Sequence, residues 1–255
     1  MEFIISASSD IGNVKSTNQD SLNVRVLETS GGKMVLAVLC DGMGGLQCGE
    51  VASASVVNAF CKWSEERLPA MAAAGIKDED ISRDWTDIAV DMNNKIKAYG
   101  AQNGFKMGTT VTAMLITQDR YYIINVGDSR AYEISTAARP LTEDQTVVAM
   151  EVKNGLLTEE QAAVDPRRSV LLQCIGASDT VRPDIFFGQP VQNAVYMLCS
   201  DGFRHEITPE EIYSCFNADN MMSAEDMQKN ELYLIGLNKQ RSERDNISVI
   251  TVRTF

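Results

Sequence analysis

Short apolar runs recur along the chain and predict buried β-strands. Residues 34–39 form a continuous apolar run that ends just before Asp41, which is typical of a strand covered on both faces. Residues 110–117 and 121–126 are rich in β-branched and aromatic side chains, and the polar residues between them predict a hairpin turn. Further strands are expected at residues 22–27, before the turn residues Gly31 and Gly32, and at 195–199 and 247–252.

Helix signals occupy the segments between these strands. Residues 49–60 are rich in small side chains, which let a helix pack close to a sheet. Apolar positions in residues 85–99 follow one helical face, and Ser82 or Asp84 is the expected N-cap. Three further helix starts are marked by capping residues, with the last helix running to about residue 237: Thr158, Thr208 and Ser223. Hairpins within groups of strands, separated by helices, predict a layered α+β fold with mostly antiparallel sheets.

Acidic clusters stand beside several of the predicted strands, although they are far apart in sequence. Aspartate carboxylates are the ligands that Mg²⁺ and Mn²⁺ prefer, and an adjacent glycine lets a backbone carbonyl approach the ion. Two such ions about 3.5–4 Å apart activate a water and clamp a phosphoryl group, so the implied reaction is phosphoester hydrolysis. The clusters are Asn18-Gln19-Asp20, Asp41-Gly42-Met43-Gly44-Gly45, Ser200-Asp201-Gly202 and Asp245-Asn246.

The length of 255 residues allows one large domain or two small ones. We expect a single domain over residues 1–255, because the acidic clusters run from residue 20 to residue 245 and two domains would divide the site. An isolated Asp-Gly pair is more often a turn than a ligand, so the metal hypothesis depends on the clusters occurring together.

The net charge of the chain disfavours some classes of binding partner. With 23 basic and 35 acidic residues the net charge is −12, which disfavours nucleic acid and anionic membranes. No stretch approaches the roughly 20 apolar residues of a membrane span. The six cysteines form no C-x-x-C pair and read as buried thiols of a reducing compartment, so we expect a cytoplasmic protein.

The acidic clusters belong to a longer ordered series of motifs that spans nearly the whole chain. The series is Gly12-x-x-Lys15-x-x-Asn18-Gln19-Asp20, Asp41-Gly42-Met43-Gly44-Gly45, Met107-Gly108-Thr109-Thr110, Gly127-Asp128-Ser129-Arg130-Ala131-Tyr132, Leu141-Thr142-x-Asp144, Asn154-Gly155-x-x-Thr158, Ser200-Asp201-Gly202 and Asp245-Asn246. In this order the motifs resemble those of the metal-dependent protein phosphatases of type 2C, especially the compact bacterial serine/threonine phosphatases.

The resemblance implies a four-layer αββα sandwich, an α+β fold in which helix pairs flank two central antiparallel sheets. A metal cleft is expected at one end of the sandwich, beside a mobile flap at about residues 141–172. The implied enzyme is a serine/threonine protein phosphatase of signalling pathways that uses two Mn²⁺ or Mg²⁺ ions and a third, weaker one. Its implied partners are phosphorylated proteins, the substrates of a serine/threonine kinase, and we expect a monomer.

The resemblance also implies roles for individual residues. The two-metal core and catalysis would depend on four carboxylates, Asp20, Asp41, Asp201 and Asp245, with the Gly42 carbonyl as a further ligand. Asp128 would hold the third ion, and Lys15 would bind the substrate phosphate.

Two positions in the first motif depart from the family. Lys15 stands where the family usually has Arg, and Gln19 stands where it usually has Glu. Lysine supplies a point charge without the bidentate fork of arginine, which predicts weaker phosphate binding. Gln19 removes one negative charge, which predicts weaker binding of the second metal.

Several residues have simpler alternative roles. Asp128 has the alternatives of pairing with Arg130 or shaping a turn, and Lys15 that of a solvated surface residue. His205 is a weak candidate for a general acid, because it does not match the family's catalytic histidine position. Asn246 is expected to hold its loop by hydrogen bonds. Thr109 and Thr110 are expected to support the site structurally.

Two rival functions remain open at the level of sequence. One is a non-catalytic relative that binds phosphoproteins through the same surface, which the substitutions at Lys15 and Gln19 favour and the complete set of four aspartates disfavours. The other is a phosphatase of the same fold that is specific for a phosphorylated anti-sigma antagonist.

Overall fold

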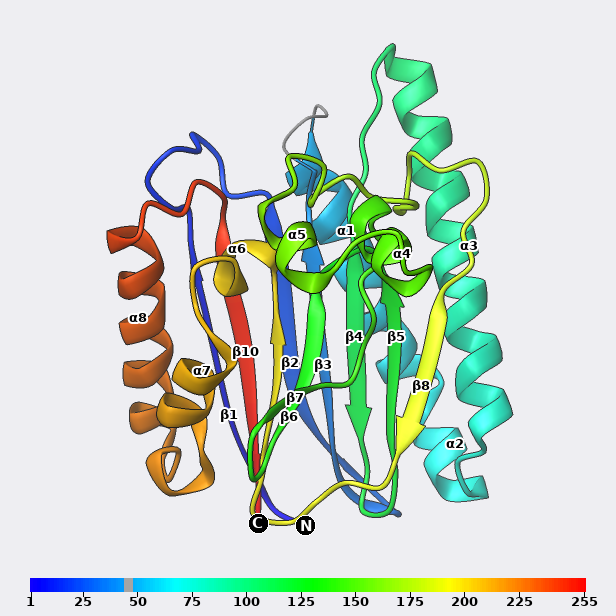
Figure 1. Ribbon diagram of the computed structural model, residues 1–255. Helices are drawn as coiled ribbons and strands as arrows, with labels where there is room; N and C mark the ends of the chain where they lie inside the picture. Colours follow the sequence, from blue (N-terminus) through cyan, green and yellow to red (C-terminus); the bar gives the residue numbers. More distant parts are fainter. Residues whose placement is uncertain (44–47) are drawn as a thin grey trace.

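Two antiparallel five-stranded sheets form the centre of the computed structural model, which describes residues 1–43 and 48–255 (Figure 1). Gly44 and Gly45 of the second acidic motif therefore lie outside the described residues. The sheet orders are β1-β10-β9-β6-β7 and β2-β3-β4-β5-β8. The strands are β1 (Phe3–Asp10), β2 (Asp20–Thr29), β3 (Gly32–Asp41), β4 (Val111–Ile116), β5 (Tyr121–Val126), β6 (Arg130–Ile134), β7 (Ala138–Pro140), β8 (Asp184–Gly188), β9 (Val195–Cys199) and β10 (Ile247–Thr254).

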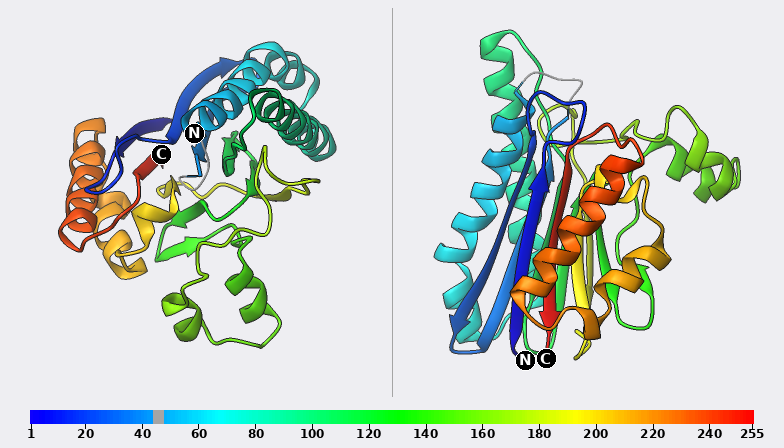
Figure 2. Two further views of the ribbon diagram at one scale, coloured as in Figure 1. Left: turned by 90° about the horizontal axis from the view of Figure 1, so that it is seen from above. Right: turned by 90° about the vertical axis from the view of Figure 1, so that its left-hand side faces the viewer.

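Helices cover the outer faces of both sheets (Figure 2). The sheet that contains β3 packs against α1 (Gly49–Glu66) and α3 (Asp78–Asn103), joined by the short α2 (Leu68–Ala74). The other sheet is covered by α6 (Asp201–Arg204), α7 (Pro209–Phe216) and α8 (Ala224–Gln240), with a 3₁₀ turn at Ala218–Asn220. The predicted αββα sandwich with antiparallel sheets is confirmed.

Strand β3 is apolar at every position from Met34 to Cys40, and its place in the fold explains why. Val35, Ala37 and Leu39 face the other sheet, while the alternate side chains face α1 and α3. Because side chains alternate across a strand, a strand between a sheet and a helix layer needs apolar residues on both faces. The continuous apolar run that predicted this strand is therefore explained by its place in the layers.

The segment at about residues 141–172 contains α4 (Val147–Lys153) and α5 (Glu159–Val164). Both short helices project from the body of the sandwich in the two views of Figure 2. Among the helices of the described ranges, none combines the length and apolar character needed to cross a bilayer.

Three of the four predicted helix caps are confirmed. Thr158 and Thr208 each form a complete capping box, and the Ser223 hydroxyl accepts a hydrogen bond from the Asp226 amide. The predicted start of α3 at Ser82 or Asp84 is wrong, since the helix begins at Asp78 without a side-chain cap. Three acidic residues in its first turn interact favourably with the helix dipole in place of a cap.

Candidate metal centre

Strand ends from both sheets place the acidic motifs at one end of the sandwich. Asp20 begins β2 and Asp41 ends β3, and the two residues lie directly opposite each other in the antiparallel register. Asp201 follows β9, and Asp245 precedes β10, the neighbouring antiparallel strand. The end of one strand and the start of its neighbour lie at the same edge, so four distant motifs meet.

Asp41 is held at the end of β3 by the two threonines of the Met107-Gly108-Thr109-Thr110 motif. The Thr110 amide donates to the Asp41 carbonyl at 2.8 Å, and the Asp41 amide donates to the Thr110 hydroxyl at 2.9 Å. The Thr109 hydroxyl also donates to the Asp41 carbonyl, at 2.8 Å. These hydrogen bonds confirm that Thr109 and Thr110 support the site structurally, as the sequence predicted.

Asn246 fastens the first motif to the last. Its Oδ1 accepts from the Gln19 amide at 2.9 Å, and its Nδ2 donates to the carbonyls of Ile11 and Thr17 at 3.0 and 3.2 Å. A β-carbon at Gly202 would lie 2.2 Å from the Asn246 carbonyl oxygen, so the Asp-Gly sequence is needed for this close approach.

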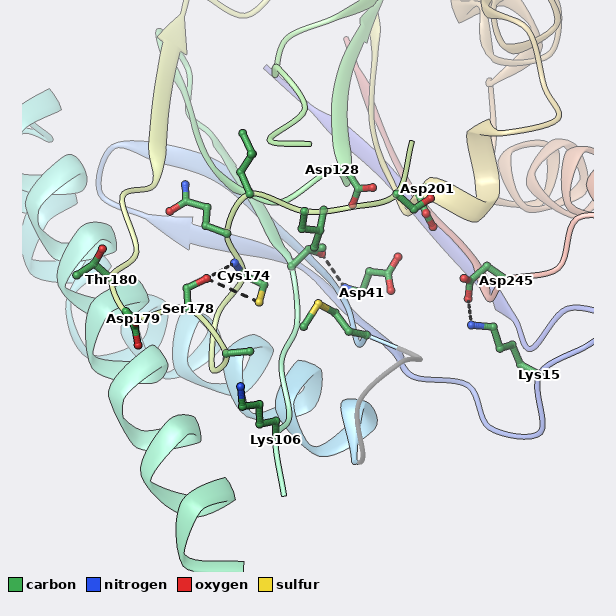
Figure 3. A pocket seen from close by; sticks show the side chains of 17 residues that line it. Lys15, Asp41, Lys106, Asp128, Cys174, Ser178, Asp179, Thr180, Asp201 and Asp245 are labelled. Atoms are coloured by element: carbon green, nitrogen blue, oxygen red, sulfur yellow. Dashed lines mark hydrogen bonds and ion pairs between the residues drawn. The ribbon is translucent and has the colours of Figure 1, made fainter. Parts of the chain in front are cut away.

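A cleft of about 870 Å³ opens over the converging motifs (Figure 3). Four of the predicted aspartates line it, and residues 169–180 form much of the remaining wall. The charged residues of the lining are Lys15, Asp41, Lys106, Asp128, Asp179, Asp201 and Asp245. Asp20 does not line the cleft, and its two carboxylate oxygens are buried beneath it.

The clustered carboxylates raise one another's proton affinity. Burial, together with the charges of Asp201 and Asp245, raises the pKa of Asp20 to about 7, although the nearby Ser248 and Ser200 hydroxyls oppose the shift. Burial and the charges of Asp20, Asp201 and other cleft aspartates raise the pKa of Asp41 well above its usual range. Like charges in so small a volume are stable only with a positive counter-charge, so the cluster favours a cation.

Unpaired oxygen atoms support the same conclusion. Both oxygens of Asp20 and Oδ1 of Asp201 are buried and have no hydrogen-bond partner within the described ranges. Buried polar atoms are normally hydrogen-bonded, and carboxylate oxygens left without a partner are the ligands that a hard divalent cation prefers. The donor set therefore fits Mn²⁺ or Mg²⁺.

The side chains are not preassembled around a single point. In residues 1–43 and 48–255 no group of three acidic, cysteine or histidine side chains has converged tightly enough to enclose an ion. Binding therefore requires side-chain rotation on a backbone that is already in place.

Asp128 lies in the turn between β5 and β6 and lines the cleft beside Asp201 (Figure 3). Burial and the Asp201 charge raise its pKa to about 7. The alternative pairing with Arg130 is wrong, because Arg130 forms a bidentate ion pair with Asp144 at 2.7 and 2.9 Å. Arg204 contacts the same carboxylate and donates to the Asp128 carbonyl, each at 2.9 Å.

Arg204 and Asp144 are thus supporting residues that the sequence did not assign. Asp144 is buried between two guanidinium groups, and despite its burial they hold its pKa below the usual range. The pair anchors the Asp128 turn to α6, which begins with Asp201. The motif Leu141-Thr142-x-Asp144 pointed to Asp144, but the sequence did not show that its partners are Arg130 and Arg204.

Lys15 lies in the cleft and is not a free surface lysine. Its Nζ forms an ion pair with Oδ1 of Asp245 at 2.8 Å, and its side chain is 28% exposed. Although partial burial opposes it, the pairing with Asp245 and the charges of Asp41 and Asp201 raise the pKa of Lys15. The ammonium is therefore charged at neutral pH and is shared with a predicted metal ligand.

Gln19 donates from Nε2 to Oε2 of Glu50 at 3.4 Å. A glutamate at this position would place a second carboxylate against Glu50, whereas the amide turns a repulsion into an attraction. Glu50 was not assigned from the sequence. The departure at Gln19 therefore has a local structural partner.

His205 lies behind the cleft and is not among its lining residues. Its ring nitrogens stand 3.6 Å from Asp201 Oδ2 and 3.5 Å from Glu243 Oε2. The position disfavours the general-acid role and indicates that His205 orients Asp201.

Comparisons with known proteins agree with this geometry. The family model described as Protein phosphatase 2C matches residues 12–232. The serine/threonine phosphatase stp of Listeria innocua is 29% identical over 249 residues, covering 95% of this chain and 92% of that protein. A solved serine/threonine phosphatase of S. agalactiae superposes with a TM-score of 0.86 at 30% identity over 100% of both chains.

A further solved structure is informative about metals. The catalytic domain of the phosphatase PstP, described as a complex with two manganese ions, aligns with a TM-score of 0.78 and 26% identity. The alignment covers 98% of this chain and 97% of that one.

Proposed function

The chain belongs to the protein phosphatase 2C family, and from this premise we propose that Asp20, Asp41, Asp201 and Asp245 bind two divalent ions for phosphate-ester hydrolysis. The protein is a metal-dependent serine/threonine protein phosphatase whose substrates are phosphoproteins. The observation that carries the site assignment is the meeting of four distant carboxylates, some with unpaired buried oxygens, at one end of the sandwich.

The bound ions supply positive charge and lower the pKa of a water molecule, which makes it a nucleophile at neutral pH. The chain's own residues position the reactants. Asp41 and Asp201 line the cleft. The carbonyl of Gly42, the residue that follows Asp41, would be a further ligand. Thr110 and Thr109 hold the Asp41 backbone, so the ligand geometry rests on hydrogen bonds within the fold.

Lys15 binds the substrate phosphate in this proposal. Its charge is secured by Asp245, which also restrains the position of the ammonium. Asp128 completes a third, weaker site, supported by its raised pKa and by the Arg204 contact to its carbonyl. Mn²⁺ or Mg²⁺ is the ion, since the donors are oxygen atoms.

The remaining assignments follow from sequence and charge. We assign residues 1–255 to one phosphatase domain, with the projecting segment of about residues 141–172 as its flap. The net charge of −12 supports phosphoprotein partners in place of nucleic acid or anionic membrane. Cytoplasmic location and a monomeric state are further parts of the proposal, and the cellular partner would be a serine/threonine kinase.

The deciding experiment measures metal binding and turnover together. Protein treated with EDTA is titrated with Mn²⁺ by calorimetry, and hydrolysis of para-nitrophenyl phosphate and of a phosphothreonine peptide is followed at each step. We expect no turnover without metal and saturation with two tightly bound ions. Turnover that persists in EDTA, or metal binding without hydrolysis of either substrate, would overturn the proposal. The second outcome would favour a phosphoprotein-binding role.

A further inference from the structure

Lys106 is a cation at the rim of the cleft to which neither the sequence motifs nor the proposed mechanism assigns a role. It lies just after α3, on the loop that leads to Thr109 and Thr110. Figure 3 shows it on the other side of the pocket from Lys15. Its side chain is exposed, while its neighbour Met107 is buried, so the loop turns the lysine outward into the cleft.

Other lysines in the cleft region form ion pairs with aspartates, but Lys106 forms none with the described residues. Lys15 pairs with Asp245, and Lys97 pairs with Asp179 at 2.6 Å. Within residues 1–43 and 48–255, Lys106 forms no ion pair. Acidic residues outnumber basic ones by 35 to 23, so a lysine without a carboxylate partner in an acidic cleft is not the expected arrangement.

Near Lys106 the charged side chains include a second lysine, Lys97, and one carboxylate, Asp179. Asp179 is strongly exposed, and the Lys97 ammonium holds its pKa below the usual range, with a further contribution from Lys106. Two lysines thus act on one carboxylate. An incoming anion would meet the Lys106 ammonium, which forms no ion pair among the described residues.

The loop that carries Lys106 is fixed relative to the metal centre. The Phe105 amide donates to the Gly100 carbonyl at 3.0 Å, and the Met43 amide donates to the Gly108 carbonyl at 3.0 Å. Thr109 and Ile175 exchange two backbone hydrogen bonds at 2.9 Å. Lys106 and Thr110 are four positions apart in the chain, which limits their Cα separation to roughly 14 Å.

We propose that Lys106 is a specificity-determining residue that binds an anionic group of the phosphoprotein substrate, placed within about four residues of the phosphorylated side chain. The anion is a carboxylate or a second phosphate, because both offer oxygen acceptors to an ammonium. This inference rests on the proposed function of the cleft.

The test compares peptides that differ only in this anion. The holoenzyme with Mn²⁺ is assayed on phosphothreonine peptides carrying alanine, glutamate or phosphoserine three residues from the phosphothreonine, with each phosphate followed by mass spectrometry. We expect kcat/KM to be about two- to fivefold higher for the acidic peptides, an effect that weakens as salt is raised. The larger gain, with glutamate or with phosphoserine, identifies the source of the anion.

Lys106→Glu is the decisive variant. It should abolish or invert the preference through KM, while hydrolysis of para-nitrophenyl phosphate, which has no flanking residues, stays within about twofold of the wild type. Lys95→Glu is the matched control, because Lys95 lies on α3 and pairs with Asp91 away from the cleft lining. It should retain the preference.

Two results would overturn the inference: no preference for acidic peptides in the wild type, or the same preference in Lys106→Glu. Either result leaves the proposed function standing as long as the wild type hydrolyses para-nitrophenyl phosphate. Failure of the proposed function has a different signature, since the wild type would then hydrolyse none of the substrates.

Discussion

Two regions of this molecule bury carboxylates, and they do so in opposite ways. Glu231 of α8 is fully buried against β1 and β10, where Oε2 accepts from the Ser6 and Ser8 hydroxyls at 2.8 and 2.7 Å and Oε1 accepts from Thr251 at 2.6 Å. Asp20 is buried at the cleft with both oxygens unpaired among the described residues. Burial raises the pKa of both groups and nearby hydroxyls oppose the shift in both, but at Asp20 the charges of Asp201 and Asp245 raise it further.

The difference separates a structural acid from a functional one. Glu231 has its acceptors satisfied by the fold, so it fastens a helix to a sheet. Both oxygens of Asp20 and Oδ1 of Asp201 have no hydrogen-bond partner among the described residues, and a bound cation would satisfy them. Burial alone therefore does not identify a site, and the informative feature is a buried carboxylate without donors.

The largest effect is expected from neutralising a cleft carboxylate. Asp41→Asn or Asp201→Asn should reduce kcat/KM more than about 100-fold, because an amide is a weaker metal ligand and these residues are closer to the ion than outer partners. Circular dichroism and thermal unfolding should show an intact fold. Asp91→Asn, on the exposed face of α3, is the control and should be fully active. Retained activity in a folded cleft variant would contradict the metal assignment.

Neutralising Glu231 should lower the stability of the protein and leave its activity unchanged. Glu231→Gln leaves fewer acceptors for three hydroxyl donors, so we expect a loss of about 1–3 kcal/mol in the free energy of unfolding. The kcat of the folded enzyme should be unchanged. Urea unfolding measures the loss, and Glu225→Gln at the exposed start of the same helix should cost less than about 1 kcal/mol. If Glu231→Gln lost activity without losing stability, Glu231 would not be a purely structural residue.

The two regions also differ in how pH acts on the metal-free protein. The pKa of Asp20 rises from its ordinary 3.8 to about 7 on folding, so the folded state holds this proton more tightly than the unfolded state. Stability from this group is therefore present below about pH 4 and is lost as pH rises to about 7. In EDTA, Asp20→Asn should gain Tm relative to the wild type across that range.

In saturating Mn²⁺ the wild type should instead have a higher Tm than Asp20→Asn, because it keeps a metal ligand that the variant lacks. A difference in Tm that is independent of pH in EDTA would show that Asp20 is not strained by its neighbours.

The smallest effect is expected at Lys15. Lys15→Arg offers a bidentate fork to phosphate, so KM should fall about two- to fivefold with little change in kcat. Lys62→Arg, on the exposed face of α1, is the control. Unchanged kinetics in Lys15→Arg would indicate that the residue serves mainly as the partner of Asp245.

Local sequence signals determined most of the architecture. The apolar run of β3, the hairpin of β4 and β5, and the caps at Thr158, Thr208 and Ser223 each depend on residues close together in the chain. Strand β1 lacked such a signal, because its Ser6 and Ser8 are polar residues whose partner Glu231 lies near the other end of the chain. Neighbouring residues cannot reveal that kind of compensation.

The aspartates proposed for the metal site were identified from the order of the motifs, but the sequence did not reveal their electrostatic surroundings. The tertiary structure decided that Arg130 pairs with Asp144 and not with Asp128, that Lys15 pairs with Asp245, and that Lys106 stays at the rim without a partner in the described chain. The physical reason is that ion pairing depends on the distance between two charges in the folded protein and not on their separation in sequence. Sequence fixes which charges exist, whereas the packing of strands and loops selects which of them come within a few ångströms of each other.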